Sequence, residues 1–123
     1  MQYRSAEAQN SSIKCAVTTG VGSHTTTSPS STRPHTALIE LRGEIAPDSE
    51  ASAEAMVSAL KTAFEDAAAQ AVVLRINSPG GSPVQAGIIN DEVRRLKAKH
   101  KKKVYVVVEE ICASGAYYVA VAA

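Results

Sequence analysis

The stretch AVVLRINSPGGSPVQ, residues 71–85, decides the fold. Residues 71–76 are nearly all apolar and half of them are β-branched, which is typical of a strand covered on both faces in a parallel sheet. Residues 77–81 break this strand with a proline and two glycines. A helix then begins, because Ser82 can be its N-cap, a proline fills the first helical position and Gln85 completes an S-x-x-Q capping box. The stretch therefore predicts a strand, a glycine loop and a helix in succession.

The segments after this stretch extend the pattern. A second strand of the buried type is predicted at residues 104–108, so residues 71–108 are expected to form a βαβ unit with parallel strands. A further helix begins after Ser114. The buried stripe of the helix between the two strands is predicted to hold Ala86, Ile89, Val93 and Leu96.

The segments before it supply a strand and a helix. A short strand is predicted at residues 37–41, followed by a turn at 42–44 that leads to Ile45. A helix follows Pro47, with Ser49 or Ser52 as its cap. Its predicted core stripe, at a spacing of three and four residues, is Ala53, Met56, Val57, Leu60, Phe64 and Ala67.

Composition limits the chain to at most one modest soluble domain. It has 123 residues, 45% of them hydrophobic, and a formal net charge of +1, which excludes a multidomain enzyme and a global field that attracts nucleic acid. The basic run at residues 101–103 has no interleaved aromatic residue, so a solvated turn is favoured over a nucleic-acid patch. The longest uncharged apolar stretch, residues 111–123, is shorter than the roughly 20 residues of a transmembrane helix. Cys15 and Cys112 are too few for a disulfide framework or a zinc site.

The chain divides near His35. Residues 1–35 are rich in Ser and Thr and carry no apolar period, so we expect a disordered tail, with a linker or processing region as the alternative. His24 and His35 are then solvated side chains. Residues 36–123 form the folded domain.

Two loops are predicted to lie at the carboxyl ends of the parallel strands, where ligands bind in such sheets. The first contains Gly80 and Gly81, whose main-chain N–H groups can approach a ligand oxygen. The second presents Ser114 between small residues. Each loop alone is compatible with an ordinary turn or an N-cap serine, and neither matches a nucleotide-binding motif. Together they offer a nucleophile and two donors, the minimum for acyl transfer.

Three blocks, ALIELRGEIA (37–46), VVLRINSPGGSPVQAG (72–87) and ICASGAYYVAVAA (111–123), resemble the signal peptide peptidase SppA family, serine peptidases of the Clp protease and crotonase-like fold. The resemblance covers residues 36–123, the N-terminal part of that catalytic domain. It implies that Ser114 is the nucleophile, that Gly81 and Gly115 donate N–H groups to the oxyanion, and that Gly80 and Ser82 contact substrate, without a metal or cofactor.

The same resemblance implies a biological setting. Complete members degrade released signal peptides as homo-oligomers at the periplasmic side of the inner membrane, with no nucleic-acid partner. The compartment of this chain stays open, because its sequence contains no signal or transmembrane segment.

The general base of the family is a lysine some tens of residues beyond the serine, whereas this chain has nine residues after Ser114. The lysines at 101–103 and His100 precede a five-residue strand that Ser114 follows, which separates them by roughly 16 Å. Ala116 also stands where the family has a second glycine. We therefore expect a truncated fragment that is inactive alone. The alternatives are a crotonase-like protein that binds acyl-CoA and a noncatalytic module that pairs with a longer homologue.

Overall fold

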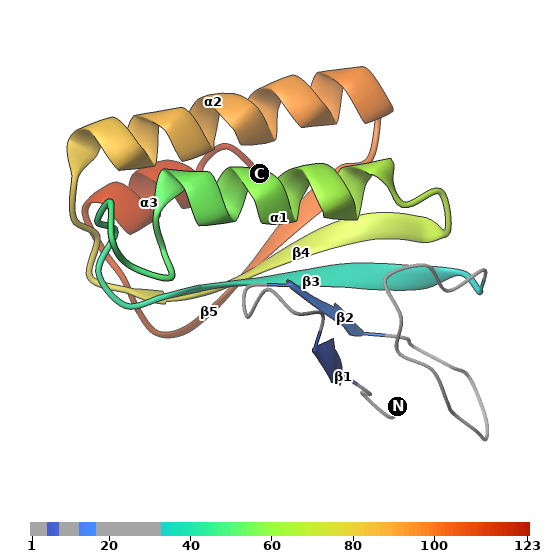
Figure 1. Ribbon diagram of the computed structural model, residues 1–123, viewed down its shortest axis with the longest axis horizontal. Coiled ribbons are helices and arrows are strands. Elements are labelled where there is room, and N and C mark those ends of the chain that lie inside the picture. The colour runs from blue at the N-terminus through green and yellow to red at the C-terminus, as the bar shows by residue number, and fades with distance from the viewer. Residues whose placement is uncertain (1–4, 8–12, 17–32) are drawn as a thin grey trace.

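The computed structural model describes residues 5–7, 13–16 and 33–123 of the chain, with side chains in the last of these ranges. The described strands form one sheet in the order β1-β2-β3-β4-β5, and the helices lie together over one face of it (Figure 1). In chain order the elements are β1 (Ser5–Glu7), β2 (Ile13–Ala16), β3 (His35–Arg42), α1 (Ala53–Glu65), β4 (Ala69–Ser78), α2 (Pro83–His100), β5 (Lys103–Cys112) and α3 (Gly115–Ala120).

The centre of the sheet is parallel, as the βαβ pattern predicts. β3 pairs with β4 and β4 pairs with β5, both in parallel, and Leu74 lies between Ile39 and Val106 in the register. β1 and β2 add an antiparallel pair beside β3. The chain therefore has an α/β fold whose three parallel strands end at the same edge.

The disordered tail expected at residues 1–35 stays a prediction. β1 and β2 both lie in that stretch, while most of its other residues, His24 included, are outside the described ranges. The prediction of a solvated His35 is wrong, because His35 begins β3 and is buried. Its ring nitrogens have polar partners in the interior, with Nε2 at 2.8 Å from Asp66 Oδ2 and Nδ1 at 2.8 Å from the Arg33 carbonyl oxygen.

Helix α1 is capped by Ser52, whose Oγ accepts a hydrogen bond from the Ala55 N–H at 3.3 Å. Most of its predicted stripe is confirmed as core, but Val57 is only half-buried and Ala67 is exposed beyond the end of the helix. Ala59 and Ala63 are buried instead, because the face of α1 that packs on the core is rotated relative to the predicted face. The buried residues of α1 are Ala53, Met56, Ala59, Leu60, Ala63 and Phe64.

Helix α2 begins where the sequence predicts, but half of the predicted capping box is absent. Ser82 Oγ accepts from the Gln85 N–H at 3.3 Å, as expected. The Gln85 side chain instead accepts from the Ala53 N–H at 2.7 Å, while the Ser82 N–H donates to the Ile45 carbonyl oxygen. Gln85 therefore joins the start of α2 to the start of α1. The predicted stripe of Ala86, Ile89, Val93 and Leu96 is buried.

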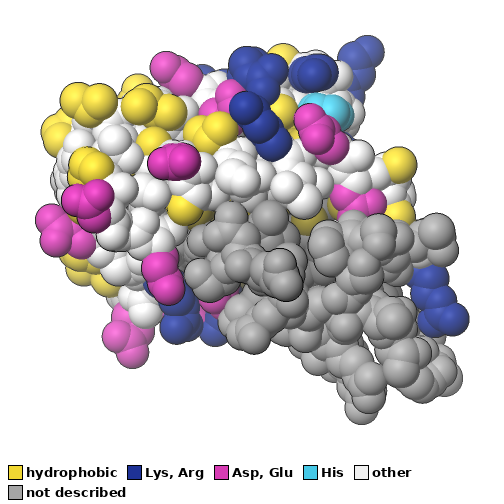
Figure 2. Space-filling model, in the orientation of Figure 1, with side chains coloured by type: hydrophobic (Ala, Val, Ile, Leu, Met, Phe, Trp, Pro, Cys, Tyr) yellow, Lys and Arg dark blue, Asp and Glu magenta, His cyan; other side chains and the backbone are white. Residues whose placement is uncertain are grey.

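Strand β5 is less buried than its sequence predicts. Val104 is buried, but Tyr105 and Val107 are each 51% exposed. β5 is an edge strand of the described sheet, and the described helices lie over one face of that sheet, so apolar side chains predicted to be covered on both faces are open on the other. The apolar sequence identifies a strand here but does not reveal what lies beside it. Figure 2 shows further hydrophobic side chains around the start of α2 and basic side chains around its end.

The basic run after α2 is not simply a solvated turn. Lys101 ends the helix in a left-handed conformation with φ 53°. Lys102 Nζ donates to the carbonyl oxygens of Phe64 at 2.8 Å and Asp66 at 2.5 Å. Burial lowers the pKa of Lys102, and the charge of Asp66 opposes this shift. Lys102 therefore fastens the turn to the end of α1.

Candidate active site

Three turns meet at the edge where the parallel strands end. They comprise residues 43–45 after β3, residues 78–82 after β4 and residues 112–115 after β5. The Ala113 N–H donates to the Ser78 carbonyl oxygen at 3.2 Å, and Ser78 Oγ donates to the Gly43 carbonyl oxygen at 2.6 Å. Hydrogen bonds therefore connect all three turns.

The orientation of Gly81 follows from a short parallel bridge to Ile45. The Ile45 N–H donates to the Gly80 carbonyl oxygen at 2.8 Å, and the Ser82 N–H donates to the Ile45 carbonyl oxygen at 2.7 Å. Because the groups on either side of Gly81 bond to Ile45, the N–H of Gly81 itself points to the opposite side.

That opposite side faces the turn after β5. A Cβ placed on Gly115 would lie 3.6 Å from the Gly81 nitrogen, so these two glycines are neighbours. Across residues 33–123, no hydrogen bond uses the main-chain N–H of Gly81 or of Gly115. Two adjacent main-chain donors are therefore available to one acceptor atom.

Ser114 lies beside these donors in an unusual backbone conformation. Its φ is 51° and its ψ is −124°, a region that non-glycine residues rarely adopt. It precedes α3, but its side chain makes no capping hydrogen bond, and the residue is exposed. The hydroxyl is therefore available for reaction. Backbone strain of this kind costs about 1–3 kcal/mol and is concentrated at functional sites.

The three predicted catalytic residues line one pocket of about 420 Å³, a volume within the range of small-molecule sites. Its wall is mostly apolar, and no Lys, His, Asp or Glu lines it. The four other lining residues were not predicted to belong to the site, although three of them lie within about one turn at the start of α2. The complete lining is Gly81, Pro83, Ala86, Gly87, Ser114, Gly115 and Tyr118.

The two predicted substrate contacts are placed differently. Gly80 lies behind the pocket, where its N–H donates to Ser78 Oγ at 3.1 Å and its carbonyl oxygen accepts from Ile45. Ser82 Oγ accepts the capping hydrogen bond of α2. Neither residue lines the pocket.

The basic residues before β5 are far from Ser114. β5 is ten residues long, twice the predicted length, which puts roughly 30 Å between its ends. His100 packs its ring against Phe64 with the centroids 5.9 Å apart, and Lys102 is held at the end of α1. The base that would activate Ser114 is not among these residues.

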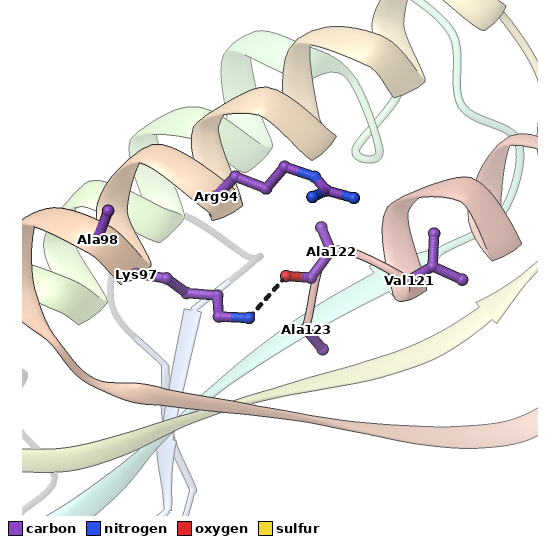
Figure 3. A pocket seen from close by; sticks show the side chains of 6 residues that line it. All are labelled: Arg94, Lys97, Ala98, Val121, Ala122 and Ala123. Carbon is purple, nitrogen blue, oxygen red and sulfur yellow. Dashed lines mark hydrogen bonds between the residues drawn. The ribbon is translucent and has the colours of Figure 1, made fainter.

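Side chains of α2 fix the position of α3. The buried Asn90 donates from Nδ2 to the Tyr118 carbonyl oxygen at 2.6 Å and accepts from Arg94 Nε at 2.9 Å. Lys97 Nζ donates to the Ala122 carbonyl oxygen at 3.0 Å (Figure 3). These contacts hold the segment after Ser114 against α2. A second pocket of about 450 Å³ lies there, lined by Arg94, Lys97, Ala98, Val121, Ala122 and Ala123.

Because the backbone of Ser114 is strained, replacing this residue with glycine should stabilise the protein. Ser114→Gly should raise the free energy of unfolding by about 1 kcal/mol, since glycine adopts a φ of 51° without strain. Urea denaturation measures the change. Ser58→Gly, on the exposed side of α1, is the matched control and should lower the free energy by about 0.5–1 kcal/mol. A loss of stability in both variants would show that Ser114 is unstrained.

Comparison with known proteins shows partial similarity to proteins of two kinds, and no family model matches the chain. The chain is 52% identical over 63 residues to a Na(+)/H(+) antiporter NhaA of Brucella melitensis, covering 51% of this chain and 9% of that protein. It is 33% identical over 87 residues to Protease 4 of Haemophilus influenzae, covering 68% of this chain and 14% of that protein. The chain thus spans a small part of the length of each relative.

No helix in the described part of the chain is long and apolar enough to cross a membrane. The similarity to Protease 4 extends over more of the chain than the similarity to the antiporter does. By sequence, the chain is a distant, partial homologue of Protease 4.

Proposed function

We propose that this chain carries the nucleophile and oxyanion part of a serine peptidase site of the signal peptide peptidase type, in a Clp protease or crotonase-like fold. The observation that carries the proposal is the convergence of Ser114 with the free N–H groups of Gly81 and Gly115 on one apolar pocket. The partial homology to Protease 4 supports the same class of chemistry.

The proposed reaction is acyl transfer from a peptide bond to Ser114. Ser114 Oγ forms a bond to the carbonyl carbon, and the electron pair of the C=O bond moves to the oxygen. That oxygen accepts hydrogen bonds from Gly81 and Gly115, and losing one such donor typically costs about 3 kcal/mol of the barrier. The hydroxyl proton passes to a base. When the C=O bond re-forms, the C–N bond breaks and the leaving amine takes the proton from the base. We assign the base to a lysine outside residues 33–123.

The proposed substrates are signal peptides released into the membrane, and the proposed assembly is a homo-oligomer without metal or cofactor. An apolar pocket beside the nucleophile suits the side chains of such peptides. The membrane-associated, periplasmic setting of complete family members is part of the same proposal.

An alkylboronic acid tests the site without needing a general base. Ser114 Oγ should form a B–O bond while its proton passes to water, so that ¹¹B NMR shows saturable conversion of trigonal to tetrahedral boron. Ser114→Ala should abolish this signal, whereas Ser58→Ala, on the exposed face of α1, should retain it. Hydrolysis of an unstructured peptide by the isolated chain should be negligible.

Two results would contradict the proposal. Equal boron signals from the wild-type chain and Ser114→Ala would show that Ser114 is not the reacting group. Binding of an acyl-CoA that is insensitive to Ser114→Ala would indicate the crotonase-like alternative, which needs the two N–H donors and no nucleophile.

A noncatalytic module is the second candidate, and the exposure of β5 favours it. Four large apolar residues along this edge strand are at least 43% exposed, namely Tyr105, Val107, Val108 and Ile111. Apolar surface on a strand edge is suited to pairing with another chain. Copurification with a full-length peptidase, together with an unreactive Ser114, would support this function.

A further inference from the structure

We propose that Ser78 is a positioning residue that sets the direction of the oxyanion donors. The inference rests on the proposed function, because it assigns Ser78 a task at that same site. Ser78 is the last residue of β4, and its exposed fraction is 0%.

Ser78 touches all three turns of the site. Its Oγ donates to the Gly43 carbonyl oxygen at 2.6 Å, on the turn after β3. The same oxygen accepts from the Gly80 N–H at 3.1 Å, within the glycine loop. Its carbonyl oxygen accepts from the Ala113 N–H at 3.2 Å, next to Ser114. One buried residue therefore connects the nucleophile loop, the oxyanion loop and the first turn.

These bonds determine where the Gly81 N–H points. Ser78 Oγ accepts a hydrogen bond from the Gly80 N–H and so fixes the orientation of Gly80. In this orientation the Gly80 carbonyl oxygen accepts a hydrogen bond from the Ile45 N–H. That bond in turn directs the Gly81 N–H to the pocket. A buried main-chain donor without a partner is unfavourable, so removing the hydroxyl makes the Gly80 N–H seek another acceptor. The glycine loop would then rotate, and the Gly81 N–H with it.

Ser78→Ala tests the inference, with Ser52→Ala as the matched control. Both changes remove a buried hydroxyl that accepts a main-chain N–H, but Ser52 caps α1 and does not line the pocket. In the full chain, Ser78→Ala should raise the Kd for the alkylboronic acid by about tenfold to a hundredfold, because small misplacements of catalytic groups have effects of this size. It should also shift or broaden the ¹⁵N–¹H signals of Gly81 and Gly115. Ser52→Ala should leave the Kd within about twofold and both signals in place.

A conservative variant separates positioning from general stability. Ser78→Thr keeps the hydroxyl, so it should restore most of the boronic acid affinity and the two glycine signals. Equal Kd values and unchanged glycine signals in Ser78→Ala and Ser52→Ala would overturn the inference. If the wild-type chain binds no boronic acid, the proposed function fails. The ¹⁵N–¹H signals of Gly81 and Gly115 still decide whether Ser78 determines the conformation of the glycine loop.

Discussion

Gly80→Ala should lower the free energy of unfolding by about 2–4 kcal/mol and abolish boronic acid binding. Gly80 has a φ of 98°, where a side chain is strained. Its Cβ would lie 2.7 Å from the Gly115 nitrogen and 2.8 Å from the Ala113 carbonyl oxygen. Both neighbours are main-chain atoms, so no side-chain rotation can relieve the overlap. The turn that carries Ser114 would have to move away from the glycine loop.

Urea denaturation measures the change in stability and ¹¹B NMR the loss of binding. Gly87→Ala is the matched control for stability only, because Gly87 lines the pocket. Gly87 lies within α2, and a Cβ there would meet nothing within 4 Å. The same chemical change should therefore raise the free energy of unfolding by about 0.5–1 kcal/mol, through the better helix propensity of alanine. Similar unfolding midpoints for the two variants would show that the glycine loop does not pack against the Ser114 turn.

Phe64→Ala should lower the free energy of unfolding by about 3–5 kcal/mol. Phe64 is fully buried on α1, and its ring lies against that of His100 at a 41° interplanar angle. Its carbonyl oxygen also accepts a hydrogen bond from Lys102 Nζ. The cavity would open where α1, the end of α2 and the start of β5 meet. Since domains are commonly stable by about 5–15 kcal/mol in total, this loss is a large fraction of the whole.

Thermal and urea unfolding, with circular dichroism as the probe, measure this loss. Phe64→Leu keeps most of the volume and should cost no more than about 1.5 kcal/mol, which keeps the comparison measurable if the alanine variant unfolds. Val84→Ala, at a residue that is 70% exposed, should change the free energy by less than about 0.5 kcal/mol. If Phe64→Ala changed the free energy as little as Val84→Ala does, Phe64 would not contribute to the stability of the core.

The strand, loop and helix at residues 71–85 could be predicted from sequence because their signals are local. A serine cap, a proline at the first helical position and a glycine pair act on the backbone within a few residues, and the structure places α2 accordingly. The environment of His35 could not be predicted, since its partner Asp66 is 31 residues away. The exposure of β5 likewise depends on which elements lie beside it and not on its own apolar residues.

At the site, too, local features could be predicted from the sequence, whereas features that depend on tertiary contacts could not. Glycines and a serine at the ends of neighbouring parallel strands indicate where chemistry can occur, and Gly81, Ser114 and Gly115 do line one pocket. The contribution of Tyr118 could not be predicted, because it depends on the contact of Asn90 with the segment after Ser114. The burial of Ser78 could not be predicted either. A serine before a proline and two glycines is typical of a surface turn, and only the tertiary fold encloses it.

The open edge of β5 has a practical consequence for handling the protein. The run VYVVV at residues 104–108 combines high β-propensity with no charge and no proline, the signature of segments that stack into amyloid-like fibrils. The charged residues of the strand lie on either side of this run, Lys103 before it and Glu109 and Glu110 after it, and none lies within it. Concentrated stocks should therefore accumulate thioflavin-positive material on standing, and dilute, cold samples should remain monodisperse for longer.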